Sequence, residues 1–368
     1  MAASPYEAWL GRAREHHRAG RVIDAWLCYR RALREDARGA DARYHLGEIA
    51  WHMGRPTEAV EQWRSLCADA PAHVASWHAL AEAAAARGDV RDAHERLAHV
   101  LALQPTNARA RALRVLLDAG EGAEARGSGD AIASALQQGP WPLALLAHLA
   151  EAVARAPTRL EDGTIEALLV AARAAPVPPG DEDALRRIAI ATRAQASDDA
   201  HQALVAHYVA ACRMLHRADR PLRWVRRCAG TRARVGVLAS NAGDATALRD
   251  AIARADLSAA VDLVVLVPVD MAPPEAVAPG QDAGRRVAIP LAAPDTAARV
   301  VAALDLDVLI DVAGLALPAA PLLARAPARR TWAFTTQGVP SHGTLADATF
   351  AARDEAAWLA ALLGAGRP

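Results

Sequence analysis

Histidine and cysteine side chains are the groups in this sequence that are best suited to binding a metal ion. Of the 13 histidines, all but His342 lie before residue 217. None of them forms a His-Glu-x-x-His motif or joins cysteine at the spacing of a zinc site. The cysteines are scattered, without a Cys-x-x-Cys pair, at Cys28, Cys67, Cys212 and Cys228. We therefore expect no metal site, and we expect reduced thiols of the kind found in cytoplasmic proteins.

Two acidic clusters and one glycine run invite other chemical interpretations. The clusters at residues 181–183 and 197–199 each precede a predicted helix, where capping and the helix dipole favour carboxylates. The glycines of the run could suggest a phosphate loop, but no apolar strand precedes them. They are Gly120, Gly122, Gly127 and Gly129. We interpret the acidic clusters as helix caps and the glycine run as a linker or a frayed helix end.

The charge balance and the hydropathy pattern argue against two classes of partner. The 42 basic and 42 acidic side chains give a net charge of zero, so no nucleic-acid partner is expected. All the basic residues among these 42 are arginine, and the sequence contains no lysine. The N-terminal residues 1–14 lack the apolar region of a signal peptide. The longest apolar stretch, residues 141–150, is far short of the roughly 20 residues that span a bilayer. These patterns predict a cytoplasmic protein without membrane insertion.

The strongest internal signal in the sequence is a period of 34 residues, which predicts that side chains are positioned on repeated helices. Gly20, Gly54 and Gly88 keep this spacing. Two further sets of residues follow in phase, namely Ala25, Ala59 and Ala93, and then Tyr29, Trp63 and Leu97. The pattern resembles the tetratricopeptide repeat (TPR), in which two antiparallel helices pack closely and a glycine ends the first. Large residues such as Trp63 are expected to fill the gap to the next repeat. A degenerate fourth repeat starts near Ala108.

Stacked repeats of this kind curve and leave a concave surface lined by the first helix of each pair. The repeat phase predicts that aromatic, charged and imidazole groups lie on or near this surface. They are Arg14, His17, Tyr44, Glu48, Trp51, His52, His78 and Glu82. Such side chains suit a segment of another protein, either extended or helical. For Trp51 and Tyr44 the alternative is packing between repeats.

The repeat period fades after residue 120, although helical apolar spacing continues. Helices are predicted over residues 141–154, 160–174, 183–196 and 199–216. From Arg234 the pattern changes to continuous apolar runs, at residues 234–240, 261–267, 286–290 and 307–314, with helices between them. This alternation predicts a parallel sheet covered on both faces.

The predicted fold class is thus an α-solenoid of tetratricopeptide repeats followed by a small Rossmann-like α/β domain with a parallel sheet. The expected domains are the repeats at 1–120, a degenerate helical-hairpin extension at 121–222 and the Rossmann-like domain at 223–368.

The C-terminal third resembles part of the O-linked N-acetylglucosaminyltransferase (SPINDLY-like) family. The resemblance rests on the Arg-Val-Gly strand at Arg234, the strand at residues 307–314, the Arg-Ala-Pro segment at Arg325 and the pair Thr331-Trp332. Order and spacing agree with the first half of that family's catalytic region. The resemblance implies repeats joined to a two-domain glycosyltransferase fold in which the second Rossmann-like domain chiefly holds the sugar nucleotide.

The departures from the family pattern bear on activity. The family's Trp-Leu-Gly-Tyr-Pro-Gly passage is Trp332-Ala-Phe-Thr-Thr-Gln337-Gly338 here, and its Met-Asp-Tyr is Ala346-Asp347-Ala348. After the first strand the family carries histidines, whereas this sequence has Asn241 and no histidine nearby. His342 is not assigned the role of these missing histidines. No lysine exists to contact a nucleotide diphosphate. The asparagine ladder of the family's repeats would fall at Gly11, His45 and Ala79.

We therefore expect a protein-binding scaffold or adaptor that is a catalytically inactive relative of protein O-GlcNAc transferases. No catalytic residue and no cofactor are assigned, and the partner is another protein or a peptide segment in the repeat groove. The alternative is a glycosyltransferase component that transfers a sugar from a UDP-sugar to Ser or Thr together with a separate nucleotide-binding chain. A third reading, association with itself or another chain through the C-terminal domain, also stays open.

Overall fold

Two compact units make up the chain in its computed structural model, residues Met1–Ala200 and His201–Pro368. The structure describes residues 4–121, 129–155, 162–216, 232–240, 242–269, 285–335, 345–351 and 354–365. The predicted boundary at residues 222 and 223 lies outside these ranges. The structure groups residues His201–His216, which were expected to belong to the helical extension, with the second unit.

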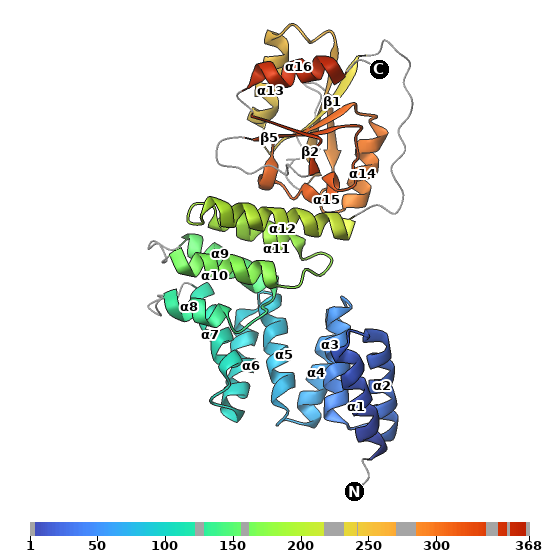
Figure 1. The fold of residues 1–368 in the computed structure, drawn as a ribbon, viewed down its shortest axis with the longest axis vertical. Coiled ribbons are helices and arrows are strands. Elements are labelled where there is room, and N and C mark those ends of the chain that lie inside the picture. The colour runs from blue at the N-terminus through green and yellow to red at the C-terminus, as the bar shows by residue number, and fades with distance from the viewer. Residues whose placement is uncertain are drawn as a thin grey trace. The chain divides into compact units, whose positions relative to one another are not determined.

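The first unit is helical throughout its described length (Figure 1). Its repeat region contains α1 (Pro5–Arg18), α2 (Val22–Glu35), α3 (Ala40–His52), α4 (Pro56–Asp69), α5 (Val74–Ala86), α6 (Val90–Leu103) and α7 (Ala108–Gly120). It continues with α8 (Gly129–Leu136), α9 (Leu143–Arg155), α10 (Asp162–Ala174) and α11 (Glu182–Thr192). Gly120 ends α7 and Gly129 begins α8, while Gly122 and Gly127 of the glycine run are outside the described residues.

A left-handed glycine follows the first helix of each of three pairs, as the repeat pattern predicts. Gly20, Gly54 and Gly88 have φ angles of 70°, 72° and 75°. A Cβ added to any of them would meet nothing within 4 Å. Space therefore does not require glycine at these positions, whereas the left-handed backbone conformation favours it.

Close packing inside a repeat depends on a residue without a side chain, Gly47, facing a large one, Trp63. A Cβ on Gly47 of α3 would lie 2.4 Å from Nε1 of Trp63 on α4. Trp63 is 3% exposed, and it belongs to the same buried cluster as Ala79 and Leu80 of α5. The indole was expected to fill the gap to the next repeat. It does share a core with that repeat, and it also packs directly on the small residue of its own pair.

The second unit holds a parallel sheet whose six described strands run in the order β3-β2-β1-β4-β5-β6. The strands are β1 (Ala233–Leu238), β2 (Val261–Pro268), β3 (Arg285–Ile289), β4 (Val308–Asp311), β5 (Thr331–Thr335) and β6 (Ala348–Ala351). The helices are α12 (Asp198–His216, from His201 on), α13 (Ala242–Arg254), α14 (Pro294–Ala303), α15 (Ala320–Leu323) and α16 (Glu355–Ala365). The predicted fold class, a helical-repeat solenoid followed by an α/β domain with a parallel sheet, is confirmed.

Helices cover both faces of this sheet, as its apolar strands require. Val235 and Val237 of β1 share a buried cluster with α13 and α16, whereas Leu238 belongs to a second cluster with α14 and α15 (Figure 1). This alternation follows from the two-residue period of a strand. Within the described part of the chain, no helix is both long and apolar enough to cross a membrane.

Candidate functional site

A cavity of about 650 Å³ opens in the first unit on the face formed by α3, α5 and α7. Six of the eight predicted groove residues line it: Tyr44, Glu48, Trp51, His52, His78 and Glu82. They recur three or four positions apart on α3 and α5, so each set projects from one face of its helix. The structure therefore brings these six residues together, as the repeat phase predicts.

The far wall of the cavity comes from parts of the chain that the repeat phase did not indicate. It includes Gln104, Asn107, Arg109, residues 140–144, Pro176, Pro178 and Asp181. Residues 104–109 lie around the start of the degenerate fourth unit, and the others lie beyond residue 120, where the repeat period has faded. Periodicity therefore gives no sign that these parts of the chain return to the face of α3 and α5. The prolines at positions 176, 178 and 179 are typical of a connecting loop and do not indicate a cavity wall.

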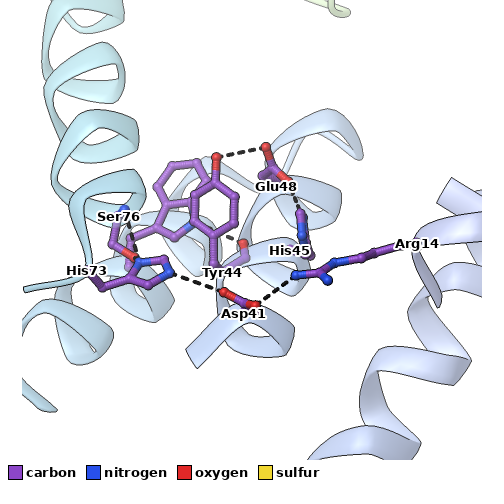
Figure 2. Close-up of polar contacts among 8 residues, drawn as sticks. Arg14, Asp41, Tyr44, His45, Glu48, His73 and Ser76 are labelled. Atoms are coloured by element: carbon purple, nitrogen blue, oxygen red, sulfur yellow. Dashed lines mark hydrogen bonds and ion pairs between the residues drawn. The ribbon is translucent and has the colours of Figure 1, made fainter. Parts of the chain in front are cut away.

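Arg14 and His17 do not line the cavity wall. The His17 ring meets the rings of Tyr29 and His45 edge-on, with centroids 6.2 and 5.8 Å apart. Arg14 of α1 donates to Oδ2 of Asp41 at 2.7 Å, and Nε2 of His73 lies 3.6 Å from Oδ1 of the same carboxylate (Figure 2). The backbone N–H of Ser76 donates to Nδ1 of His73, so the ring proton belongs on Nε2, facing Asp41. The first helices of three successive repeats are linked in this way. Sequence reasoning missed Asp41 and His73.

Glu48 is fixed by two neighbours on its own helix. The Tyr44 hydroxyl donates to Oε1 at 2.9 Å, and Nδ1 of His45 lies 2.6 Å from Oε2 (Figure 2). Burial by itself would raise the pKa of Glu48, but these hydrogen bonds and the charges of His45 and His17 outweigh it and lower the pKa. Burial and the nearby carboxylate raise the pKa of Tyr44. Glu48 is therefore ionised and Tyr44 neutral at neutral pH.

Arg109 joins Glu82 to the far wall. Its Nε donates to Oε1 of Glu82 at 2.7 Å, and its Nη2 donates to the carbonyl of Pro140 at 3.0 Å. The guanidinium lies over the ring of Trp141, 4.8 Å from the centroid, which is the geometry of a cation–π contact. Because this arginine is fully engaged, it serves to hold the wall together.

The cavity wall carries more acidic than basic groups. Its carboxyl groups are those of Glu48, Glu82 and Asp181, and its single guanidinium is that of Arg109. Burial lowers the pKa of His78, against the raising effect of Glu82, so this imidazole is neutral at neutral pH. A cationic side chain is thus the better electrostatic complement to this wall.

Aromatic rings complete the wall, and two of them keep exposed surface. Trp63 and Trp141 are 3% and 1% exposed, so they are core residues that reach the cavity only at an edge. Tyr44 and Trp51 are half-buried. The ring of Trp51 lies 5.9 Å from that of Trp63. Trp51 therefore packs between repeats and also faces the cavity, so packing and a place on the concave surface are compatible for this residue.

In the second unit, the residues that carry the transferase resemblance have structural contacts. Asp311, which is fully buried, accepts the backbone N–H of Gly314 at 3.1 Å. Asp347 accepts the N–H of Thr331 at 2.6 Å. Trp332 is 3% exposed and packs edge-on against Phe350. Other positions singled out in the sequence lie outside the described residues: Cys228, Asn241, Gln337, Gly338 and His342.

Comparison with known proteins gives similar structures but no family. No family model matches the sequence, and no curated protein matches it. An O-GlcNAc transferase mutant from Thermobaculum terrenum is similar at 15% identity and a TM-score of 0.32, over 92% of this chain and 53% of the transferase. The chain thus spans about half of that protein's length.

Two further similar structures each cover a little more than half of the chain. A thermophilic TPR protein from Thermus thermophilus has 23% identity and a TM-score of 0.32, over 56% of this chain and 98% of its own length. PilF from Pseudomonas aeruginosa has 14% identity and a TM-score of 0.36, over 57% and 91% of the two chains. TPR proteins and an O-GlcNAc transferase, the two resemblances noted in the sequence, are therefore both among the similar structures.

Proposed function

We propose that the first unit is a protein-binding module that takes a segment of another protein into the cavity between α3, α5 and α7. The observation that carries this proposal is the combination of two half-buried aromatic rings, Tyr44 and Trp51, with an excess of carboxylates in one concave site. Aromatic side chains are common anchors at interfaces because they bury a large area with few rotamers to freeze.

The partner segment is expected to present a basic side chain flanked by apolar ones. An arginine or lysine can place its charge near Glu48 while its aliphatic part contacts Tyr44 or Trp51. A grip on the peptide backbone through an asparagine ladder has no support in the repeats. The only asparagine there, Asn107, uses its side-chain oxygen to accept the N–H of Ala110 and cap α7. Recognition is therefore assigned to side chains.

A random peptide library selected on the full chain tests the proposal. We expect enrichment of peptides that carry arginine or lysine next to an apolar residue, with affinity that falls as salt is raised. A double variant, Glu48→Gln with Glu82→Gln, keeps the shape of the wall while removing two charges. It should bind the selected peptides at least tenfold more weakly.

The matched control is Glu61→Gln, because Glu61 is an exposed acid on α4 that does not line the cavity. This variant should bind the selected peptides like the wild type. Failure to enrich any peptide, or equal binding by the double variant and the wild type, would overturn the proposed role of the cavity.

We propose that the second unit is catalytically inactive and that the whole chain is a cytoplasmic adaptor. In favour of the alternative, a transferase component, the strand order β3-β2-β1-β4-β5-β6 is that of nucleotide-binding sheets with a crevice between β1 and β4. Against it, the sequence has no lysine to offset a diphosphate charge. Calorimetry with UDP-N-acetylglucosamine separates the two. We expect no binding, and a dissociation constant below about 100 µM, near −5.5 kcal/mol, would favour the transferase.

A further inference from the structure

Three side chains with metal-binding atoms, drawn from two successive repeats, lie together beside the cavity. His17 belongs to α1, whereas His45 and Glu48 belong to α3, and one ligand atom of each lies within 4.8 Å of the other two. His45 and Glu48 are three positions apart on one face of α3, with Nδ1 and Oε2 already 2.6 Å apart (Figure 2). Sequence spacing did not reveal this group, because all of α2 separates His17 from the other two residues.

The composition of the group suits a transition-metal ion. Two imidazoles and one glutamate form a ligand set that is found at zinc sites with a fourth position left to water. Imidazole nitrogen also favours zinc and its neighbours over magnesium or calcium. In a tetrahedral site with bonds of about 2 Å, ligand atoms stand roughly 3.3 Å apart. The wider separations in the group must therefore shrink by on the order of 1 Å, whereas the 2.6 Å pair of His45 and Glu48 must open slightly. All three side chains are half-buried, which leaves them room to turn.

Two tyrosines surround the group as the outer shell of a metal site would. The Tyr44 hydroxyl holds Oε1 of Glu48, which leaves Oε2 on the side of the imidazoles. The ring of Tyr29 stacks on His45 with centroids 5.0 Å apart and meets His17 edge-on at 6.2 Å. Tyr29 is fully buried, yet its hydroxyl has no hydrogen-bond partner in the described part of the chain. A buried hydroxyl without a partner is costly, and a metal-bound water could supply one.

We propose that His17, His45 and Glu48 bind a divalent transition-metal ion, with zinc as the best fit to this ligand set. The ion would link the first helices of the first two repeats. It would stabilise the folded state by an amount that grows with the logarithm of its free concentration once that exceeds the dissociation constant. The metal group shares Glu48 with the proposed peptide-binding cavity, and the test below uses the chain without any peptide partner.

The test uses the full chain without a histidine tag, freed of metal by a chelator and then desalted. Zinc is titrated in competition with a chromophoric chelator, and cobalt is titrated while its visible absorption is recorded. We expect one tight site and the intense visible band of a four- or five-coordinate cobalt ion. His17→Ala should abolish the band and weaken zinc binding more than tenfold, because loss of an outer-shell partner alone typically costs 10–100-fold.

His16 provides a matched control one position away in the sequence. It lies on the same helix, and its Nδ1 accepts a hydrogen bond from Arg21 instead of joining the group. His16→Ala should therefore bind zinc and cobalt like the wild type. Tyr44→Phe, which releases Oε1 of Glu48, should weaken zinc binding about 10–100-fold.

A second measurement covers the case in which His17→Ala does not fold. Carbethoxylation of the wild-type chain, mapped by mass spectrometry, should be slowed by zinc at His17 and unchanged at His16. Zinc binding that is no tighter in the wild type than in a folded His17→Ala variant would overturn the proposal. Equal modification of His17 with and without zinc would do the same. The selected peptides play no part in these measurements, so a failure here leaves the peptide-binding result unaffected.

Discussion

Trp51 combines a packing contact with an exposed ring edge, which makes it the sharpest single probe of the cavity. We predict that Trp51→Ala weakens binding of a selected peptide at least thirtyfold, about 2 kcal/mol, because an aromatic anchor is removed. It should also lower the melting temperature by several degrees, because part of the contact with Trp63 is lost. Fluorescence anisotropy and differential scanning calorimetry measure the two effects.

Trp77→Ala separates these two effects. Trp77 is half-buried on α5, stacks on His99 with centroids 4.3 Å apart and does not line the cavity. This variant should lower the melting temperature and leave peptide affinity unchanged. Equal loss of affinity in both variants would mean that binding follows general stability and not the cavity.

At the scale of single residues, the repeat phase of the sequence indicates the residues of α3 and α5 that line the cavity, but not those of the far wall. Tyr44, Glu48 and His78 line the cavity from the helix faces that the repeat phase indicates. Arg109, on α7, and Trp141 were not assigned, since the repeat is degenerate from Ala108 on and its phase does not specify how the chain returns to the groove. Likewise, the contact of His17 with His45 depends on the angle between repeats, which a repeat period does not specify.

The repeat glycines give a prediction at the scale of one helix end. Gly54→Ala should destabilise the chain by about 1 kcal/mol, because alanine must adopt the left-handed conformation at φ 72°. Gly11→Ala, inside α1, should instead stabilise it by roughly 0.5–1 kcal/mol. A Cβ at either position meets nothing within 4 Å, so the pair isolates backbone conformation from packing. Urea unfolding measures both, and a shift in the same direction for both variants would refute this account.

The ion pair between α9 and α11 gives a pH dependence with a defined sign. Nε of Arg187 donates to Oε1 of Glu151 at 2.7 Å, and this hydrogen bond lowers the pKa of Glu151 despite partial burial. The stabilisation is therefore present above the unfolded pKa and is lost as the pH falls through the lower folded value. Both side chains are partly exposed, so we expect a contribution of only about 0.2–1 kcal/mol.

Urea unfolding of Arg187→Gln and of the wild type measures that contribution. The wild type should be more stable at pH 7, and the difference should shrink at pH 3. Arg173→Gln, at an exposed arginine on α10, should change neither value. A difference between Arg187→Gln and the wild type that is the same at both pH values would show that Glu151 does not titrate as described.

At the scale of elements, the helices and the strands with runs of Val, Ile and Leu were predictable, and the last two strands were not. The runs at residues 234–240 and 261–267 correspond to β1 and β2, because continuous apolar strands stand out against helices. The strand β5 was noticed only through the transferase resemblance, and β6 only as part of a motif comparison. They have 5 and 4 residues, as β3 and β4 do, but their sequences contain no Val, Ile or Leu, so no aliphatic run marks them as strands.

At the scale of the whole molecule, the place of α12 can be tested with two fragments. Residues His201–His216 group with the second unit, and Tyr208 and Cys212 are 1% and 0% exposed. A fragment of residues 201–368 should therefore melt cooperatively and at a higher temperature than residues 224–368. Calorimetry and analytical ultracentrifugation of both fragments provide the test. A monomeric, cooperative 224–368 fragment with an equal melting temperature would show that α12 is not part of this unit's core.

The strand order also fixes when each unit can fold as the chain leaves the ribosome. In the centre of the sheet β1 pairs with β4, and Arg234 donates to Asp307, 73 residues later. The native pairing of β1 with β4 therefore cannot form until β4 has been synthesised. The repeats contact mainly their neighbours and form quickly once two or three have emerged. The cavity between α3, α5 and α7 can therefore start to assemble while the sheet is still being made.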